Sequence, residues 1–205
     1  DQDFGEAVTL GADVTFSGTN VSFGSTIDGA QALTVNASGT TTFSDAIGGT
    51  TALTSVTTDA NGTVSLNGNV ATTGDQRFDD AVTLTTGVVL LADDVFMSAV
   101  DLDANQLTLN VSGTAGVVAG VISGTGSVVK TGPGNQRLSG SNTYSGNPRV
   151  IAGTLTLRHV SDTNTIDSSP LIAVAAGAEL DVTGLPNGEI QVSDNQVIRG
   201  EGTVD

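Results

Sequence analysis

The sequence predicts an all-β fold and, within that class, a β-solenoid of roughly ten stacked coils. Three observations lead to this prediction. Glycine supplies 27 of the 205 residues, whereas aromatic residues make up 3% and charged residues 14%. Short runs of alternating apolar and polar residues follow one another too closely for helices to lie between them. One stretch also recurs 74 residues later, and internal repeats are typical of solenoids and arrays.

Composition favours strands and a core of small side chains. Threonine and valine are abundant, and both are β-branched residues that favour strands. Strong helix formers such as Lys, Arg, Met and Glu are scarce. Hydrophobic residues reach 38%, which is too many for a disordered chain. We therefore expect strands around a core of small aliphatic residues.

The alternating runs predict short strands with one apolar face. Examples are AVTL at 7–10, DVTF at 13–16 and NVSF at 20–23, and Gly, Asn, Asp and Ser lie between such runs. An antiparallel sandwich or barrel is the alternative, but it usually has longer strands and larger aromatic core residues. A solenoid with three strands and about 20 residues per coil would form a rod about 50 Å long.

The internal repeat divides the chain. DQDFGEAVTL at 1–10 returns as DQRFDDAVTL at 75–84, with seven of the ten positions identical. The same register continues as far as Gly39 and Gly113. We therefore assign residues 1–123 to two copies of a 74-residue unit, 1–74 and a partial copy at 75–123, and residues 124–205 to a continuation of the same solenoid. The chain starts inside a repeat, so we expect it to be part of something longer.

Residues 124–157 carry a resemblance to a known repeat. GTGSVVKTGPG, LSGSNTYSG and VIAGTLTL follow one another in this stretch. Their order and spacing closely resemble the autotransporter-associated β-strand repeat of bacterial surface proteins. The departures are Arg137, Pro148 and Arg149, where that repeat usually has small polar residues. They are either surface drift, which we favour, or positions tuned for contact.

The resemblance implies a fold and a location. The 74-residue units are similar to repeats of filamentous-haemagglutinin-like adhesins, so together the two resemblances cover nearly the whole chain. They imply a right-handed parallel β-helix in an autotransporter-type passenger, secreted or attached to the outer membrane at the bacterial cell surface. They imply no particular ligand.

Charge excludes several partners. The formal net charge is −16, from 22 acidic and six basic residues, and such a surface repels nucleic acid. No apolar run approaches the roughly 20 residues that span a bilayer, so we expect no membrane insertion of this segment. Cysteine is absent, which excludes disulfides and thiolate metal sites.

We predict no catalytic residue, cofactor or metal ligand. His159 is the only histidine, and Asp162 follows it as a conceivable orienting group, but an exposed structural role is favoured. Neither a calcium-binding nonapeptide nor an EF-hand loop is present, so acidic pairs could bind Ca²⁺ only weakly. These pairs are Asp79/Asp80, Asp93/Asp94 and Asp101/Asp103.

The expected function is structural and adhesive. A solenoid can lengthen by copying coils, and its end coils expose unpaired strand edges. We expect a stalk or a self-assembling filament unit, with partners that are further coils of the same chain, other copies joined end to end, or a host or matrix surface ligand. The alternative is a polysaccharide-active lyase or hydrolase. A groove holding clustered Asp with Lys130, the only lysine, or with an Arg would favour that alternative.

Overall fold

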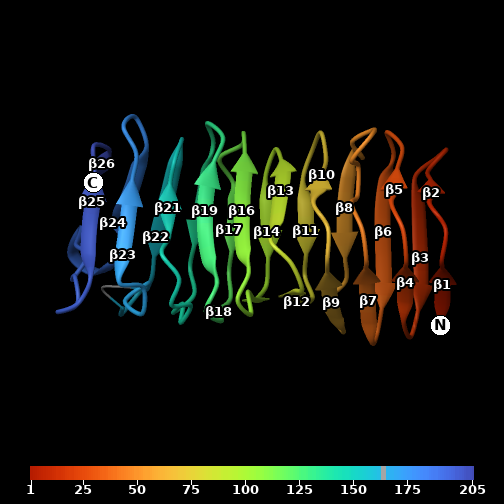
Figure 1. Ribbon diagram of the computed structural model, residues 1–205, viewed down its shortest axis with the longest axis horizontal. Helices are drawn as coiled ribbons and strands as arrows, with labels where there is room; N and C mark the ends of the chain where they lie inside the picture. Colours follow the sequence, from red (N-terminus) through yellow and green to blue (C-terminus); the bar gives the residue numbers. More distant parts are fainter. Residues whose placement is uncertain (163–164) are drawn as a thin grey trace.

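A computed structural model describes residues 1–162 and 165–205. The predicted all-β solenoid is confirmed, because every strand ladder is parallel and the longest sheet has ten strands. Successive coils lie beside one another along the long axis, and the two ends of the chain lie at opposite ends of the rod (Figure 1). The described residues contain no helix long and apolar enough to cross a membrane.

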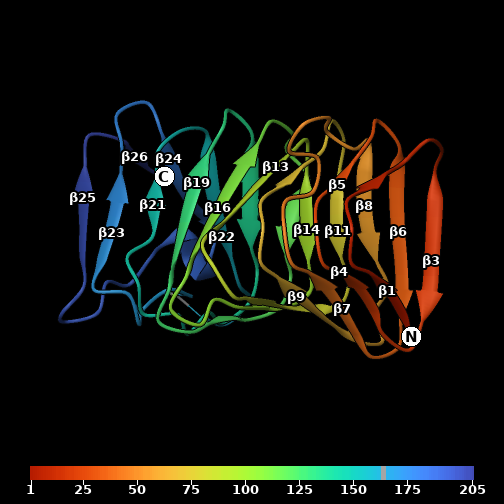
Figure 2. The ribbon, with the colours of Figure 1, turned by 45° about the vertical axis from the view of Figure 1, so that its right-hand side comes forward.

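Three sheets form the sides of the coil. The first sheet contains, in ladder order, β1 (Gln2–Phe4), β4 (Val21–Phe23), β7 (Thr40–Phe43), β9 (Thr63–Leu66), β12 (Ala81–Leu84), β15 (Val100–Asp101) and β18 (Ile122–Ser123). The second sheet contains β10 (Val70–Ala71), β13 (Val88–Ala92), β16 (Gln106–Val111), β19 (Ser127–Thr131), β21 (Arg149–Val150), β23 (Leu171–Val174) and β25 (Val197–Gly200). Figure 2 shows β13 to β25 following one another along one side of the rod.

The third sheet is the longest. It contains β3 (Val14–Gly18), β6 (Ala32–Ala37), β8 (Ser55–Thr58), β11 (Gln76–Phe78), β14 (Val95–Met97), β17 (Gly116–Val118), β20 (Asn135–Leu138), β22 (Thr154–Arg158), β24 (Glu179–Gly184) and β26 (Thr203–Val204). A short pair, β2 (Val8–Thr9) and β5 (Ile27–Asp28), begins the side that the second sheet continues, through bridges from Ile27 to Ile47 and from Ile47 to Val70. A 3₁₀ turn covers Pro186–Gly188.

The core consists of columns of like side chains. Strand alternation turns every second residue inward, and the parallel register places it against its equivalent in the next coil. In the second sheet Val88, Leu107 and Val128 form such a column, and all three are buried. The first coils hold an aromatic version, in which Phe23 is stacked between Phe4 and Phe43 at ring-centroid distances of 5.1 and 5.5 Å.

The 74-residue repeat does not keep its segments on one sheet. Gln2 lies in β1 of the first sheet, whereas its sequence equivalent Gln76 lies in β11 of the third. Val21 and Val95 are separated in the same way. Ladder partners in neighbouring coils are 18 to 26 residues apart. Four coils from Gln2 lead to Val82, 80 residues on, so 74 residues is not a whole number of coils here. The division of the chain into repeat units stays a prediction from the sequence.

Candidate functional site

His159 is not oriented to act as a general base toward Ser141, although the two side chains lie within hydrogen-bonding distance. Its Nε2 lies 3.2 Å from the Ser141 hydroxyl. Its Nδ1 accepts a hydrogen bond from the backbone N–H of Asp162 at 3.0 Å. In a neutral imidazole the nitrogen that accepts carries no proton, so Nε2 carries it and donates to Ser141. This arrangement supports the structural role expected for His159.

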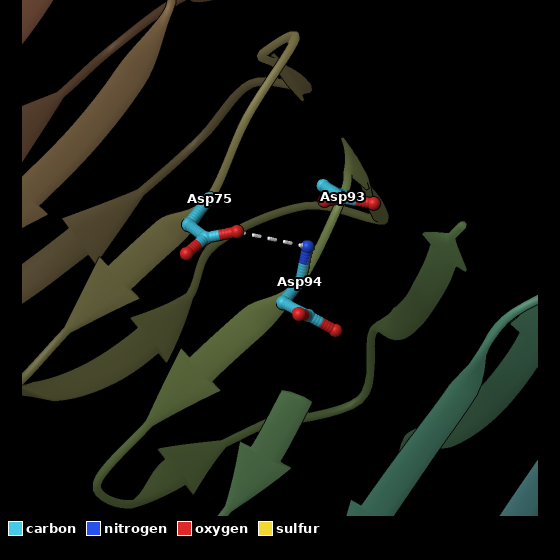
Figure 3. Close-up of side chains that lie close together, drawn as sticks. All are labelled: Asp75, Asp93 and Asp94. Atoms are coloured by element: carbon cyan, nitrogen blue, oxygen red, sulfur yellow. Dashed lines mark hydrogen bonds between the residues drawn. The ribbon is translucent and has the colours of Figure 1, made fainter. Parts of the chain in front are cut away.

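One group of acidic residues within the described ranges comes close enough to surround a cation. Carboxylate oxygens of Asp75, Asp93 and Asp94 lie within 4.8 Å of one another. Figure 3 shows the Asp94 backbone N–H donating to the Asp75 carboxylate, at 3.3 Å. Asp94 Oδ1 itself accepts two backbone N–H bonds at 2.9 Å from Ala115–Gly116 in the next coil. These carboxylates therefore already brace one turn against the next. Of the predicted acidic pairs, only Asp93/Asp94 belongs to this cluster.

A polar groove lies on the outer face of the third sheet, and Arg137 and Arg158 stand in its middle. Arg137 is on β20 and Arg158 at the end of β22, which is the next strand of the ladder. Two adjoining hollows, each of about 450 Å³, both have these two arginines in their walls. We call this surface the Arg137 groove; its other wall and floor residues used below are Asn135, Thr156, Asp181 and Thr183.

The floor of the Arg137 groove is a row of hydrogen-bonding side chains. The Thr156 hydroxyl lies 3.0 Å from both Asn135 Oδ1 and Asp181 Oδ2. Its single proton can serve only one of them. The Asp181 carboxylate also accepts from the hydroxyl and the backbone N–H of Thr183, at 2.6 and 2.9 Å. Burial raises the pKa of Asp181, but the bonds from Thr183 and Thr156 outweigh burial and hold that pKa below its usual value.

An irregularity in the sheet shapes the groove. Thr156 pairs with Asp181, whereas Arg158 pairs with Gly184, so β24 has one residue more than β22 over this interval. Such a bulge bends a strand and redirects its side chains. A Cβ atom on Gly184 would lie 2.9 Å from the Leu157 carbonyl oxygen and 3.0 Å from Arg158 Cβ. Glycine therefore lets the backbone of β24 approach the base of the Arg158 side chain.

Neither groove arginine is neutralised within the described residues. The one ion pair among them joins Arg77 and Asp79, at 3.4 Å. Arg137 Nε is buried and has no hydrogen-bond partner among these residues. Both guanidinium groups thus remain available on a chain whose acidic residues far outnumber its basic ones.

Comparison with known proteins shows that part of this groove, including Arg137 and Arg158, lies in a segment that matches a known repeat. Residues 128–165 match the family described as Passenger-associated-transport-repeat. The chain contains an autotransporter-passenger repeat. A segment of 118 residues, 58% of this chain, is 31% identical to the Adhesin BmaC autotransporter of Brucella suis biovar 1 (strain 1330) and covers 3% of that protein. No solved structure shows a significant match.

The passenger repeat also contains Lys130, and its environment rules out a surface role. Lys130 is buried in β19, and its Nζ donates to the carbonyl oxygens of Thr131, Gly132 and Ala152 at 2.8, 3.0 and 3.2 Å. Burial lowers its pKa from 10.5 to about 8. Three carbonyl oxygens match the three protons of an ammonium group. The only lysine of the chain is therefore a structural element of the coil.

The sequence singles out one residue of the groove, Arg137, as a departure from the repeat, and surface drift is the favoured explanation. Neither Arg158 nor a groove is predicted from the sequence. Arg158 lies 21 residues after Arg137, two residues past Thr156, which is the ladder partner of Arg137 in the next coil. Searching the sequence for charged residues about one coil apart would have paired them. The bulge beside them has no sequence signal that we recognise.

Proposed function

We propose that this chain is an adhesive, non-enzymatic segment of a bacterial surface passenger, and that it acts as a stalk or filament unit outside the cell. The observation that carries the proposal is the passenger repeat at 128–165 within an uninterrupted stack of parallel coils. The similarity to an autotransporter adhesin supports the same location and role. That protein is far longer than this chain, so the proposal concerns only the segment.

The physical properties of the rod suit this role. Each coil contacts only its neighbours, so a stack of coils gives length without a new core. Ladder hydrogen bonds run along the axis, aliphatic columns fill the interior, and acidic side chains cover the outside. A net charge of −16 keeps neighbouring rods apart in solution.

Surface display tests the proposal. The chain would be placed between a signal peptide and the translocating barrel of an autotransporter in a non-adherent laboratory bacterium. We expect protease-accessible protein on the cell surface and increased attachment to cultured animal cells or matrix-coated wells. A matched control carries a β-solenoid of similar length and charge from an unrelated protein. Equal attachment by the two strains would contradict the adhesive role, and absence of surface exposure would contradict the passenger assignment.

The polysaccharide-active alternative has one observation in its favour. The Arg137 groove holds one acidic residue, Asp181, together with two arginines, which meets part of the expectation of clustered Asp with Lys130 or an Arg. The bonds that lower the pKa of Asp181 make it a weak base and a poor proton donor at neutral pH. Binding without bond cleavage therefore fits the groove better. Release of unsaturated or reducing ends from acidic polysaccharides by the purified chain would favour the enzyme.

A further inference from the structure

We propose that the Arg137 groove binds a carboxylate-bearing sugar unit of an acidic glycan, with Arg137 and Arg158 holding the carboxylate and the floor residues holding hydroxyl groups. The inference names a ligand class for the adhesive surface and rests on the proposed function for its biological setting. The binding chemistry itself depends only on the groove.

The two arginines are placed to share one anionic group. Their strands, β20 and β22, are neighbours spaced about 4.8 Å apart, and Arg158 is displaced from Arg137 by two residues, about 6.6 Å, along the ladder. Both line both hollows of the groove. A guanidinium group presents a planar fork of N–H donors that matches a carboxylate, and two forks can hold its two oxygens. Arg137 Nε is a buried donor without a partner among the described residues, and a movement of the Arg137 side chain toward the ligand would let it donate to a ligand oxygen.

The floor is suited to sugar hydroxyls. The protons of the Thr156 and Thr183 hydroxyls already serve Asn135 or Asp181, so both hydroxyl oxygens are left to accept, the Asn135 amide nitrogen can donate, and the Asp181 carboxylate accepts. A pyranose ring offers hydroxyl groups that donate and accept in the same way. The hollow that Asn135, Asp181 and Thr183 line is bordered mainly by polar atoms, and its volume of about 450 Å³ falls in the range of small-ligand sites.

The same observations disfavour an acidic peptide. Peptides bind sheet proteins by pairing with an exposed strand edge or by placing apolar side chains in pockets. The Arg137 groove lies on a sheet face, between β20, β22 and β24, whose ladder partners are already made. Among the described residues that line its two hollows, Ala115 and Val160 are the only apolar ones apart from glycine, and Val160 is 94% exposed, so they form no deep pocket for an apolar side chain. A glycan needs neither feature.

Calorimetric titration with trigalacturonate tests the inference on the whole 205-residue chain. We expect wild type to bind this ligand and to bind its neutral methyl ester at least about tenfold more weakly. Arg158→Gln and Arg137→Gln should each weaken binding about tenfold or more, since each removes a charge-assisted contact. Arg158→Lys should also weaken it, because the charge remains but the fork is lost.

Arg149→Gln is the matched control. Arg149 is exposed on β21 of the second sheet, and its loss changes the net charge by the same amount. Circular dichroism spectra of all variants would confirm that the coils remain folded. Binding within twofold of wild type is expected for Arg149→Gln. Equal weakening by Arg149→Gln would overturn the site, because net charge alone would then explain the effect.

Three further outcomes would overturn the inference: no binding of trigalacturonate by wild type, unchanged binding by both groove variants, or equally tight binding of triglutamate. These outcomes leave the proposed function testable, because attachment of displaying cells is measured separately. Cells that adhere although trigalacturonate does not bind would refute the groove and keep the adhesive role. Specific trigalacturonate binding without cell attachment would support the groove as a binding site and refute the adhesive role.

Discussion

Lys130 shows how a single residue can depart from its surroundings inside the core. In the second sheet it occupies a column formed by Leu90, Leu109 and Val150, and only the carbonyl oxygens at the corner make its charge tolerable. Burying a charge is costly unless it is fully hydrogen-bonded. The ammonium group ties the corner at Gly132 to the corner of the next coil at Ala152.

Lys130→Met should remove a pH dependence of stability. Because burial lowers the folded pKa of Lys130 to about 8 from 10.5, the unfolded chain binds more protons between these values. Stability from this group therefore rises as pH increases through that window, by at most about 1.4 kcal/mol per pH unit. Burial raises the pKa of Tyr144, which acts in the opposite direction above pH 10. Urea unfolding at pH 7.5 and 9.5 should show a smaller increase for the variant. An identical increase in both proteins would contradict this account.

Asp80 is a second buried ionisable residue, and only one of its two carboxylate oxygens is hydrogen-bonded among the described residues. Its Oδ1 accepts from the Gly62 backbone N–H at 2.7 Å, but Oδ2 is buried without a partner among the described residues. Burial raises the pKa of Asp80; the Gly62 bond opposes that shift, and the charge of Asp59 adds to it. A carboxyl with a raised folded pKa stabilises below its unfolded pKa and loses that contribution as pH rises.

Asp80→Asn should therefore raise the free energy of unfolding at pH 7. The amide keeps an oxygen for the Gly62 bond and carries no charge. The advantage should shrink toward pH 4, where the wild-type carboxyl becomes neutral. The matched control is Asp79→Asn, an exposed carboxylate whose loss should change stability by less than about 0.5 kcal/mol. Urea midpoints at the two pH values measure both effects. Destabilisation by Asp80→Asn at pH 7 would show that the charged form is needed.

At the scale of the strand, sequence reasoning performs well on alternation and poorly on corners. Runs such as AVTL and DVTF indicated which side chains face inward, because a period of two is a local property of extended backbone. Why a glycine is required at each corner, whether for a positive φ or for a close approach of backbone, could be decided only from the structure. Gly124 has a positive φ of 102°, as turn glycines do, whereas a Cβ on Gly126 would lie 1.8 Å from the Asn105 carbonyl oxygen in the coil before.

The sheet to which each strand belongs also could not be predicted from the sequence. Any alternating segment fits any of the three sides, since each side needs only an apolar inner face. Gln2 and Gln76 therefore share a sequence context and lie on different sheets. The Arg137 groove was missed for the same reason, because its members come from three coils and a bulge between β22 and β24.

The aromatic column offers a test at the scale of the element. Phe23 contacts Phe4, Phe16 and Phe43, so its loss would leave a cavity between three rings. We expect Phe23→Ala to cost about 3–5 kcal/mol. Phe96 is the matched control, because it faces outward on β14 and only covers the Arg77 guanidinium, at 4.4 Å. Phe96→Ala should cost about 1 kcal/mol. Chemical unfolding of both variants measures the difference, and equal costs would argue against a packed aromatic column.

For the whole molecule, the end coils and the net charge act against each other. Half-buried apolar side chains, among them Phe16, close one end of the 205-residue rod, and Val204 continues the inner column of Leu180 at the other. Open strand edges attract further strands. The charge of −16 repels a second copy. We propose that these ends pair with further coils of the same chain or, in the isolated chain, with another copy.

Self-association of the isolated chain should consequently depend on concentration and increase with salt, since salt screens the repulsion between rods. Sedimentation velocity at 20 and 500 mM NaCl would measure this. Val204→Lys should reduce association because it puts a charge at the end of the core, even though it lowers the net negative charge. Val160→Lys makes the same change in charge at a position that is 94% exposed and follows β22, two strands from β26 in the ladder, and it should not reduce association. If both variants associate equally, or if wild type stays monomeric at every salt and protein concentration, end-to-end pairing of copies is wrong.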